Sequence, residues 1–267
     1  MKKVESRPVM TNVPAALLAA GMAALLAAGT VARADNTTPE EVKKKWDSVA
    51  TAGVTLTRGN SKTFLANLSV NTKRTWTNNE VLLGANAGYG ENTTTDASGA
   101  KVDNTTDSYI KGFGQWNHLF SPQTYAGVRV AGEHDDIANL TYRFIVSPLA
   151  GYYFVKETNQ FLCGEIGPAY VREKFFGEGV HNYIALRVAE RGEHKFASGA
   201  KIWEGVEWLP KVSDFQNYLV NAEVGVSAPI SKGLNISLVL QDTYKSAPAK
   251  GKLKNDLKLI AGIGYLF

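Results

Sequence analysis

The chain contains a single cysteine, Cys163, among its 267 residues. One thiol cannot form an intramolecular disulfide, so stability must come from burial, hydrogen bonding or a surrounding bilayer. Beyond Ala34 the chain also lacks sustained helical periodicity and any long uncharged apolar run. We therefore expect no membrane-spanning helix in that part of the chain.

Net charge is nearly absent once the amino-terminal segment is set aside. Residues 1–12 are basic, residues 13–32 carry no charge, and the tripeptide at 32–34 has the small-x-small pattern of a signal-peptidase site. We expect residues 1–34 to be a signal peptide cleaved after Ala34; a membrane anchor is the alternative. Removing its four basic residues and one acidic residue leaves 25 basic against 24 acidic side chains, which gives no reason to expect nucleic acid as a partner.

What recurs in the rest of the chain is alternation of apolar and polar residues. In the segments 64–71, 81–89 and 218–228, every second residue is apolar. The residues between them are mostly Asn, Ser and Gly. A period of two with one apolar face and one polar, glycine-rich face predicts β-strands.

Such segments, together with the turn signals between them, predict about twelve strands. We place them at residues 46–58, 62–76, 80–92, 106–119, 123–135, 140–155, 159–174, 181–191, 197–209, 215–228, 233–246 and 255–267. Tight turns alternate with longer polar loops, which we expect at 91–107, 174–182, 210–216 and 246–255.

The polar face decides between a soluble and a membrane barrel. Its Gly, Asn, Ser, Thr and Gln side chains are too small and polar to fill the core of a soluble barrel. A barrel that is apolar outside needs lipid around it, and only a closed sheet satisfies every backbone group there. We therefore predict an all-β, transmembrane, antiparallel up-and-down β-barrel of about 12 strands at 46–267, after a periplasmic lead-in at 35–45. A soluble periplasmic β-protein is the alternative.

Aromatic residues on the apolar face support the membrane barrel, because Trp and Tyr gather at the two boundaries between lipid and water. One group falls near the tight-turn ends of the strands: Trp46, Trp76, Trp116, Tyr152, Phe154 and Tyr265. A second group falls near the long-loop ends: Tyr89, Tyr142, Phe144, Tyr170 and Tyr244.

The sequence ends on LKLIAGIGYLF at 257–267, which fits a last strand with its apolar face toward lipid. Terminal Phe267, with Tyr265 two places before it, resembles the C-terminal signal by which the barrel assembly machinery recognises bacterial outer-membrane proteins. We expect this machinery and outer-membrane lipid as partners, and the bacterial outer membrane as the location.

A family resemblance rests on longer segments: residues 46–76, YRFIVSPLAGYYF, GEIGPAYVRE, VEWLPKVSDFQNY and the closing GIGYLF. Over about residues 46–267 the chain resembles the YdiY-like family of salt-induced outer-membrane proteins. The most specific piece is the Gly-Asn-Ser turn after the first predicted strand. The function of this family is unknown, so the resemblance implies a location and a fold but no catalytic residues.

Isolated charges on the polar face would line the lumen of such a barrel. They are Lys73, Lys111, Arg129, Arg143, Glu165, Arg187, Glu223 and Lys258. A twelve-stranded barrel is wider than the filled eight-stranded kind and narrower than a large porin, so its width allows a path for a small solute. Alternatively, these charges pair across the lumen and plug it, leaving a structural barrel without transport.

Two prolines complicate the strand pattern, because each removes a hydrogen-bond donor from the sheet. Pro148 and Pro168 fall inside neighbouring predicted strands. A three-residue turn between those strands would place the prolines opposite one another, towards the outer rim. Alternatively, each proline ends a shorter strand.

The rival function is an outer-membrane lipid hydrolase, which requires a serine activated by a histidine and a third group that orients the histidine. No histidine of the sequence lies in an H-x-S motif or beside a glycine-flanked serine, and no cluster has zinc spacing. We therefore expect no enzyme, no metal and no cofactor.

Overall fold

The computed structural model consists of twelve β-strands. Its described residues are 46–58, 64–95 and 101–267, with only the backbone described at 55–58, 64–65, 92–95, 101–104 and 106–107. The strands are β1 (Asp47–Arg58), β2 (Phe64–Thr75), β3 (Asn79–Thr95), β4 (Lys101–Leu119), β5 (Thr124–Asp135), β6 (Leu140–Lys156), β7 (Gln160–Phe175), β8 (Val180–Lys195), β9 (Lys201–Lys211), β10 (Asp214–Ser231), β11 (Leu234–Lys245) and β12 (Asn255–Leu266). The expected signal peptide at 1–34, the lead-in at 35–45 and the Gly-Asn-Ser turn lie outside the described residues. Among those that are described, no helix has the length and apolar character needed to cross a membrane.

The strands close into one antiparallel barrel. Each strand pairs with its neighbours in sequence, and β12 completes the circle by pairing with β1, with Val49 opposite Leu266. Closure leaves no free edge, so every strand has a hydrogen-bonding partner on both sides. The predicted up-and-down barrel of twelve strands is confirmed.

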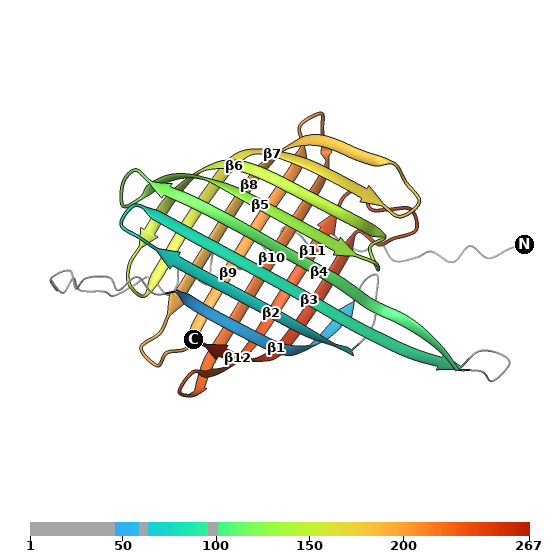
Figure 1. Ribbon diagram of the computed structural model, residues 1–267, viewed down its shortest axis with the longest axis horizontal. Coiled ribbons are helices and arrows are strands. Elements are labelled where there is room, and N and C mark those ends of the chain that lie inside the picture. Colours follow the sequence, from blue (N-terminus) through green and yellow to red (C-terminus); the bar gives the residue numbers. More distant parts are fainter. Residues whose placement is uncertain (1–45, 59–63, 96–100) are drawn as a thin grey trace, which may run out of the picture.

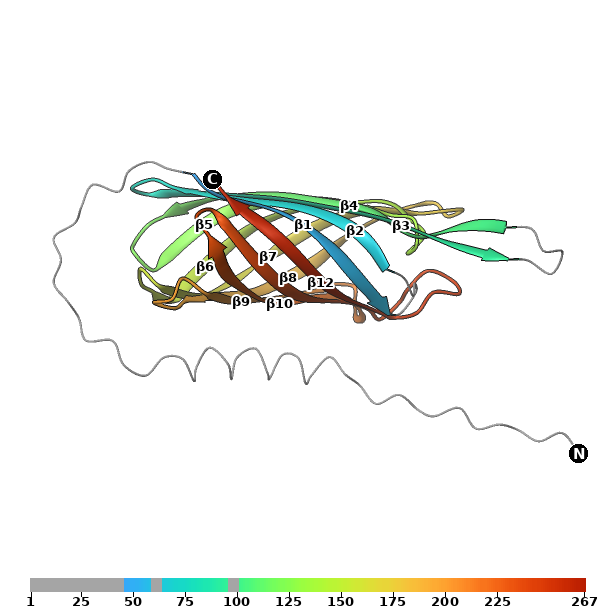
Figure 2. The ribbon, with the colours of Figure 1, turned by 90° about the horizontal axis from the view of Figure 1, so that it is seen from below.

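The barrel is flattened and its strands are tilted. In Figure 1 the strands of the near wall, β2 to β5, cross those of the far wall at a large angle. Figure 2, turned by 90°, shows the two walls lying close together. Side chains from opposite walls can therefore meet across the lumen.

Residue alternation places apolar side chains outside and polar ones inside. On β2, Leu68 is 64% exposed whereas its neighbour Asn67 is 5% exposed. The same contrast separates exposed Ile166 from buried Glu165 on β7. The outer aromatic residues are largely exposed at both ends of the strands, as with Phe154 near a tight turn and Tyr89 towards the opposite end.

The expected long loop at 91–107 is wrong in extent. The ladder between β3 and β4 continues past a bulge at Gly90 and Glu91 to the pair Thr95 and Lys101. Figure 2 shows this hairpin projecting beyond the rest of the barrel. The threonines at 93–95 are β-branched, and such residues favour an extended backbone even where they are polar.

Other connections are also shorter than expected. The predicted loop at 210–216 is a turn of which only residues 212–213 lie outside the strands, and the loop at 174–182 reduces to 176–179. Polar residues at these positions belong to strand ends, because strands that extend beyond the bilayer need no apolar face.

Pro148 and Pro168 lie within continuous strands, so the interpretation that each ends a shorter strand is wrong. The register between Val146–Tyr170 and Ala150–Ile166 puts the prolines opposite one another, near the middle of β6 rather than towards its rim. The ladder is interrupted there, and the buried Ser147 hydroxyl donates to the Pro168 carbonyl oxygen at 2.9 Å. A side chain thus replaces a missing backbone donor.

Candidate functional site in the barrel lumen

The inner face of the barrel divides into two halves of different chemistry. The ion-paired half is the inner face of β4 to β9, where charged residues bond to one another. The small-residue half is the inner face of β10 to β12 and β1 to β3, whose middle positions are mainly Gly, Ser, Thr and Asn.

Glu165 is the centre of the ion-paired half. Its carboxylate accepts hydrogen bonds from Arg187 at 2.9 Å and from Arg191 at 2.7 Å. Gln115 and Tyr125 donate to the same carboxylate, at 2.7 Å and 2.9 Å. These donors come from β4, β5 and β8, so one carboxylate on β7 joins four strands.

The cluster continues towards β9 through Glu207. The Arg187 guanidinium donates to Glu207 at 2.5 Å, and Arg129 of β5 lies 3.9 Å from the same oxygen. The Arg129 guanidinium also lies over the Phe113 ring, 3.9 Å from its centroid. The contact between Arg129 and Glu207 spans the lumen, because β5 and β9 are not neighbours in the sheet.

A second cluster surrounds Arg143 nearer the long-loop end. Its guanidinium donates to Glu133 at 2.5 Å and to Glu173 at 2.6 Å. A cavity of about 30 Å³ lies beside this cluster and is lined by three lysines and three acidic residues among others. These are Lys111, Lys245, Lys258, Glu133, Asp135 and Asp256.

A third cluster lies near the tight-turn end. Glu80 at the start of β3 accepts a hydrogen bond from the Tyr153 hydroxyl at 2.6 Å and lies 3.4 Å from the Lys156 ammonium. The Lys73 ammonium lies 5.3 Å from the centroid of the Phe161 ring, which links β2 to β7 across the lumen.

The structure thus brings Arg129, Glu165 and Arg187 into one cluster and leaves the other predicted residues elsewhere. Lys258 lies over the Tyr109 ring, 3.6 Å from its centroid. Glu223 on β10 accepts hydrogen bonds at 2.7 Å from Trp203 and from Gln241.

Glycines of the inner face pair with aromatic residues of the neighbouring strand. Gly84 lies opposite Phe113, and a Cβ added to it would meet that ring at 2.3 Å. Gly225 lies opposite Trp203, where the corresponding distance is 2.1 Å. Each ring therefore lies flat over a glycine and occupies less of the lumen than an upright ring would.

Carboxylates also occur on the outer face. The sequence predicts few charges there, because the apolar face of the clearest strands points outward. Glu190 and Glu204 alternate with the inward residues of β8 and β9, and the pairs Glu190–Val206 and Gly192–Glu204 make them diagonal neighbours. Glu204 is only 6% exposed, and its Oε1 atom has no hydrogen-bond partner among the described residues.

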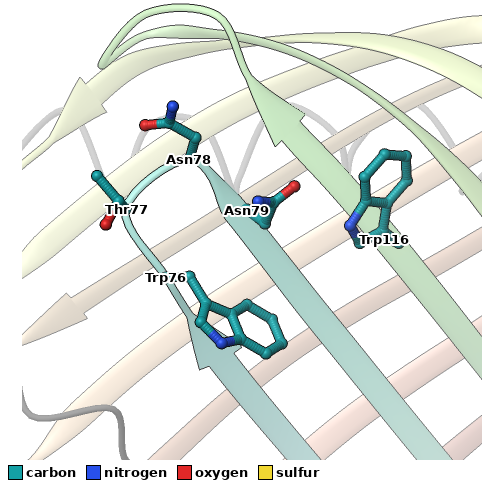
Figure 3. A pocket seen from close by; sticks show the side chains of 5 residues that line it. All are labelled: Trp76, Thr77, Asn78, Asn79 and Trp116. Carbon is teal, nitrogen blue, oxygen red and sulfur yellow. The ribbon is translucent and has the colours of Figure 1, made fainter.

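The larger cavity, of about 490 Å³, lies outside the lumen at the β2–β3 turn. Figure 3 shows Trp76 and Trp116 beside it, with the polar residues of the turn, Thr77, Asn78 and Asn79, next to them. With two indole rings and the polar residues of the turn as its lining, the cavity is an aromatic groove of the outer surface.

The histidines bond to groups other than a serine hydroxyl. His118 contacts the Asn79 side chain at 3.2 Å, and His134 contacts Asp136 at 3.1 Å. His181 lies 3.5 Å from Glu178, and His194 contacts the Gln160 side chain at 3.1 Å. Among the described residues, no group of His, Cys, Asp and Glu is arranged to hold a metal ion.

The sequence prediction of the lumen missed several charged members of the clusters, among them Arg191, Glu207 and Glu80. Arg191 and Glu207 share the inward parity of Arg187 and Trp203, so extended alternation could have found them. Glu80 is the first residue of the predicted strand at 80–92, where alternation does not decide whether a side chain points into the lumen.

A family model described as a protein of unknown function, DUF481, matches residues 50–267. The chain belongs to this family. The family resemblance seen in the sequence is thereby confirmed. A comparison with curated proteins gives no match.

Among solved structures, the DUF481 chain is similar to the NanC porin, with a TM-score of 0.53 and 8% identity over 81% of this chain and 98% of that chain. A KdgM porin in complex with disordered oligogalacturonate has a TM-score of 0.46 and 9% identity over 82% of this chain and 99% of that chain. At such identity the NanC match shows the fold alone. This DUF481 protein therefore has the fold of a porin-like barrel.

Proposed function

We propose that this protein is a narrow outer-membrane channel for small hydrophilic solutes. The observation that carries the proposal is the inversion of the barrel, with polar side chains on the inner face and exposed apolar side chains on the outer face. A polar interior is useful to a protein in lipid when it holds water and solutes.

The two halves of the lumen support a path beside the ion pairs. The charged groups of the ion-paired half bond to one another, whereas the middle positions of the small-residue half carry short side chains such as Gly53, Ser69 and Gly262. Contacts across the lumen, such as Arg129 with Glu207, narrow this path and restrict it to small solutes. We propose that the eight charged residues expected in the lumen form part of its wall, with the buried Arg143, Glu165 and Arg187 behind the more exposed ones.

The competing function is a plugged barrel without transport, and the contacts across the lumen favour it. Conductance of the purified protein in planar lipid bilayers distinguishes the two functions. A channel gives discrete conductance steps, and Arg129→Ala should enlarge them because it removes a contact that spans the lumen. If neither the native protein nor this variant conducts at any salt concentration, the channel proposal is wrong.

Export and assembly complete the proposal. Residues 1–34 are removed as a signal peptide, and Tyr265 with Phe267 presents the last strand to the barrel assembly machinery. Tyr265 and Phe267 are 54% and 65% exposed, with stacked rings 6.2 Å apart, so both are accessible to a partner.

Two experiments test export and assembly. The amino-terminal sequence of the protein from outer-membrane fractions should begin at Asp35, and deletion of Phe267 should lower the amount of folded barrel in the membrane. The family resemblance also implies that the protein is induced by salt, which is tested by comparing its amount in cells grown at low and at high salt concentration.

A further inference from the structure

Two carboxylates in the lumen, Glu165 and Glu80, are each more deeply buried than a cation that binds them. The Glu165 side chain is 1% exposed, whereas Arg191, which binds it, is 26% exposed. Arg187 binds both Glu165 and Glu207. Arg129 contacts Glu207 from the opposite wall of the barrel. Three guanidinium groups thus meet two carboxylates, and the more deeply buried carboxylate is shielded from lumen water.

The same order recurs near the tight-turn end. The Glu80 side chain is 1% exposed and its partner Lys156 is 31% exposed. The register of β2 and β3 pairs Thr75 with Glu80, so inward-facing Lys73 is a diagonal neighbour of the same carboxylate. Two ammonium groups therefore accompany one buried carboxylate.

We infer that this channel selects small anions, such as inorganic anions and short carboxylates, over cations. The inference rests on the proposed channel function. A solute in the lumen meets the water-facing sides of Arg191 and Lys156, while the carboxylates that balance them lie deeper in the wall. Arg129 and Glu207 are about equally exposed, so this pair adds little to either sign. In a narrow passage with low-dielectric walls, the charge nearest the solute sets the local concentration of ions.

Two features limit the preference and supply further tests. Glu223 faces the lumen from β10 and is held by the neutral donors Trp203 and Gln241, so it opposes the excess of cations. The residues beside the long-loop cavity carry both signs in equal number. The middle and the tight-turn end of the lumen are therefore expected to set the selectivity.

The experiment is the reversal potential of the purified full-length protein in a planar bilayer under a potassium chloride gradient. The native protein should give the sign of a chloride-preferring channel. Arg191→Gln and Lys156→Gln should each reduce the ratio of chloride to potassium permeability several-fold, and Glu223→Gln should raise it. Arg191→Lys keeps the charge and should keep the preference, which separates charge from packing.

Matched controls remove a positive charge from outside the lumen. Arg172→Gln changes an exposed arginine of β7, and Lys232→Gln changes an exposed lysine of the β10–β11 turn. Both should leave the reversal potential unchanged. Heat-modifiable migration on a gel verifies that each variant is folded before it is measured.

The outcomes separate the two proposals. A conducting protein that prefers potassium, or whose preference is the same in Arg191→Gln, Lys156→Gln and the controls, overturns the anion inference and leaves the channel intact. Absence of conductance overturns the channel itself. A chloride preference that falls only in the two lumen variants supports both.

Discussion

The ion-paired half and the small-residue half of the barrel keep polar groups stable in different ways. In the ion-paired half, two arginines, a glutamine and a tyrosine from three strands converge on Glu165 and exclude water from it. In the small-residue half, Asn71 is exposed, and its short amide lies over Gly84. The first half is thus a cross-linked polar core, and the second is built mainly of short, uncharged side chains, which cannot cross-link the strands by ion pairs at its middle positions.

The comparison predicts the largest effect for loss of the central carboxylate. Glu165→Ala leaves Arg187 and Arg191 without this partner and should destabilise the barrel by about 3–5 kcal/mol. Asn71→Ala, the control in the other half, should cost about 0.5 kcal/mol or less. Equilibrium urea unfolding in phospholipid vesicles, followed by tryptophan fluorescence, measures both. Equal costs would mean that the two halves do not differ.

The small-residue half should nevertheless be sensitive to added volume. Gly84→Val forces a side chain into the Phe113 ring and should cost about 1–3 kcal/mol. The double variant with Phe113→Ala should recover part of this loss. Gly112→Ala is the control, because its Cβ would meet only the Gly84 carbonyl oxygen at 3.5 Å. The same vesicle unfolding assay applies; a tolerated valine at 84 would show that the ring is free to move.

A neutral hydrogen bond in the ion-paired half sharpens the comparison. Ser147→Ala removes the hydroxyl that bonds to the Pro168 carbonyl oxygen and should cost about 1 kcal/mol. Ser237→Ala, in the small-residue half, provides the reference in unfolding measurements. If Ser147→Ala destabilised the barrel as much as Glu165→Ala, the loss of stability in Glu165→Ala could not be explained by arginines left without a partner.

The smallest expected effect concerns the outer face of β9. Glu204→Leu replaces an outward carboxylate and should stabilise the protein by about 0.5 kcal/mol, because charged groups on the lipid face of a barrel are unfavourable. Glu207→Leu on the same strand should have the opposite sign, since it removes a partner of Arg187. Thermal unfolding of both variants in detergent gives the two signs. A less stable Glu204→Leu variant would indicate an unrecognised partner of Glu204.

Much of the fold follows from alternation alone. The period of two identifies the strands and divides residues such as Leu68 and Asn67 between the two faces, because successive side chains of a strand point to opposite sides. Strand ends were less predictable, as the β3–β4 hairpin shows, because outside the bilayer a polar strand and a polar loop have similar compositions.

The clusters of the lumen could not be predicted in the same way. Alternation places Arg129, Glu165 and Arg187 on the inner face, but their bonds depend on the register of β5 to β9. Gln115 and Glu165 are 50 residues apart in sequence. They form a hydrogen bond only because the register of the strands between them places both at the same level along the barrel axis. Nothing in the local pattern shows that Glu165 is enclosed by donors.

The sequence by itself determined the strands, the two faces and the family, since these depend on residue type and a period of two. The tertiary structure decided which inward charges meet, which glycines lie under aromatic rings, and that Glu204 faces outward beside Glu190. These contacts join strands that are distant in sequence. Only barrel closure, register and the flattened cross-section bring them together.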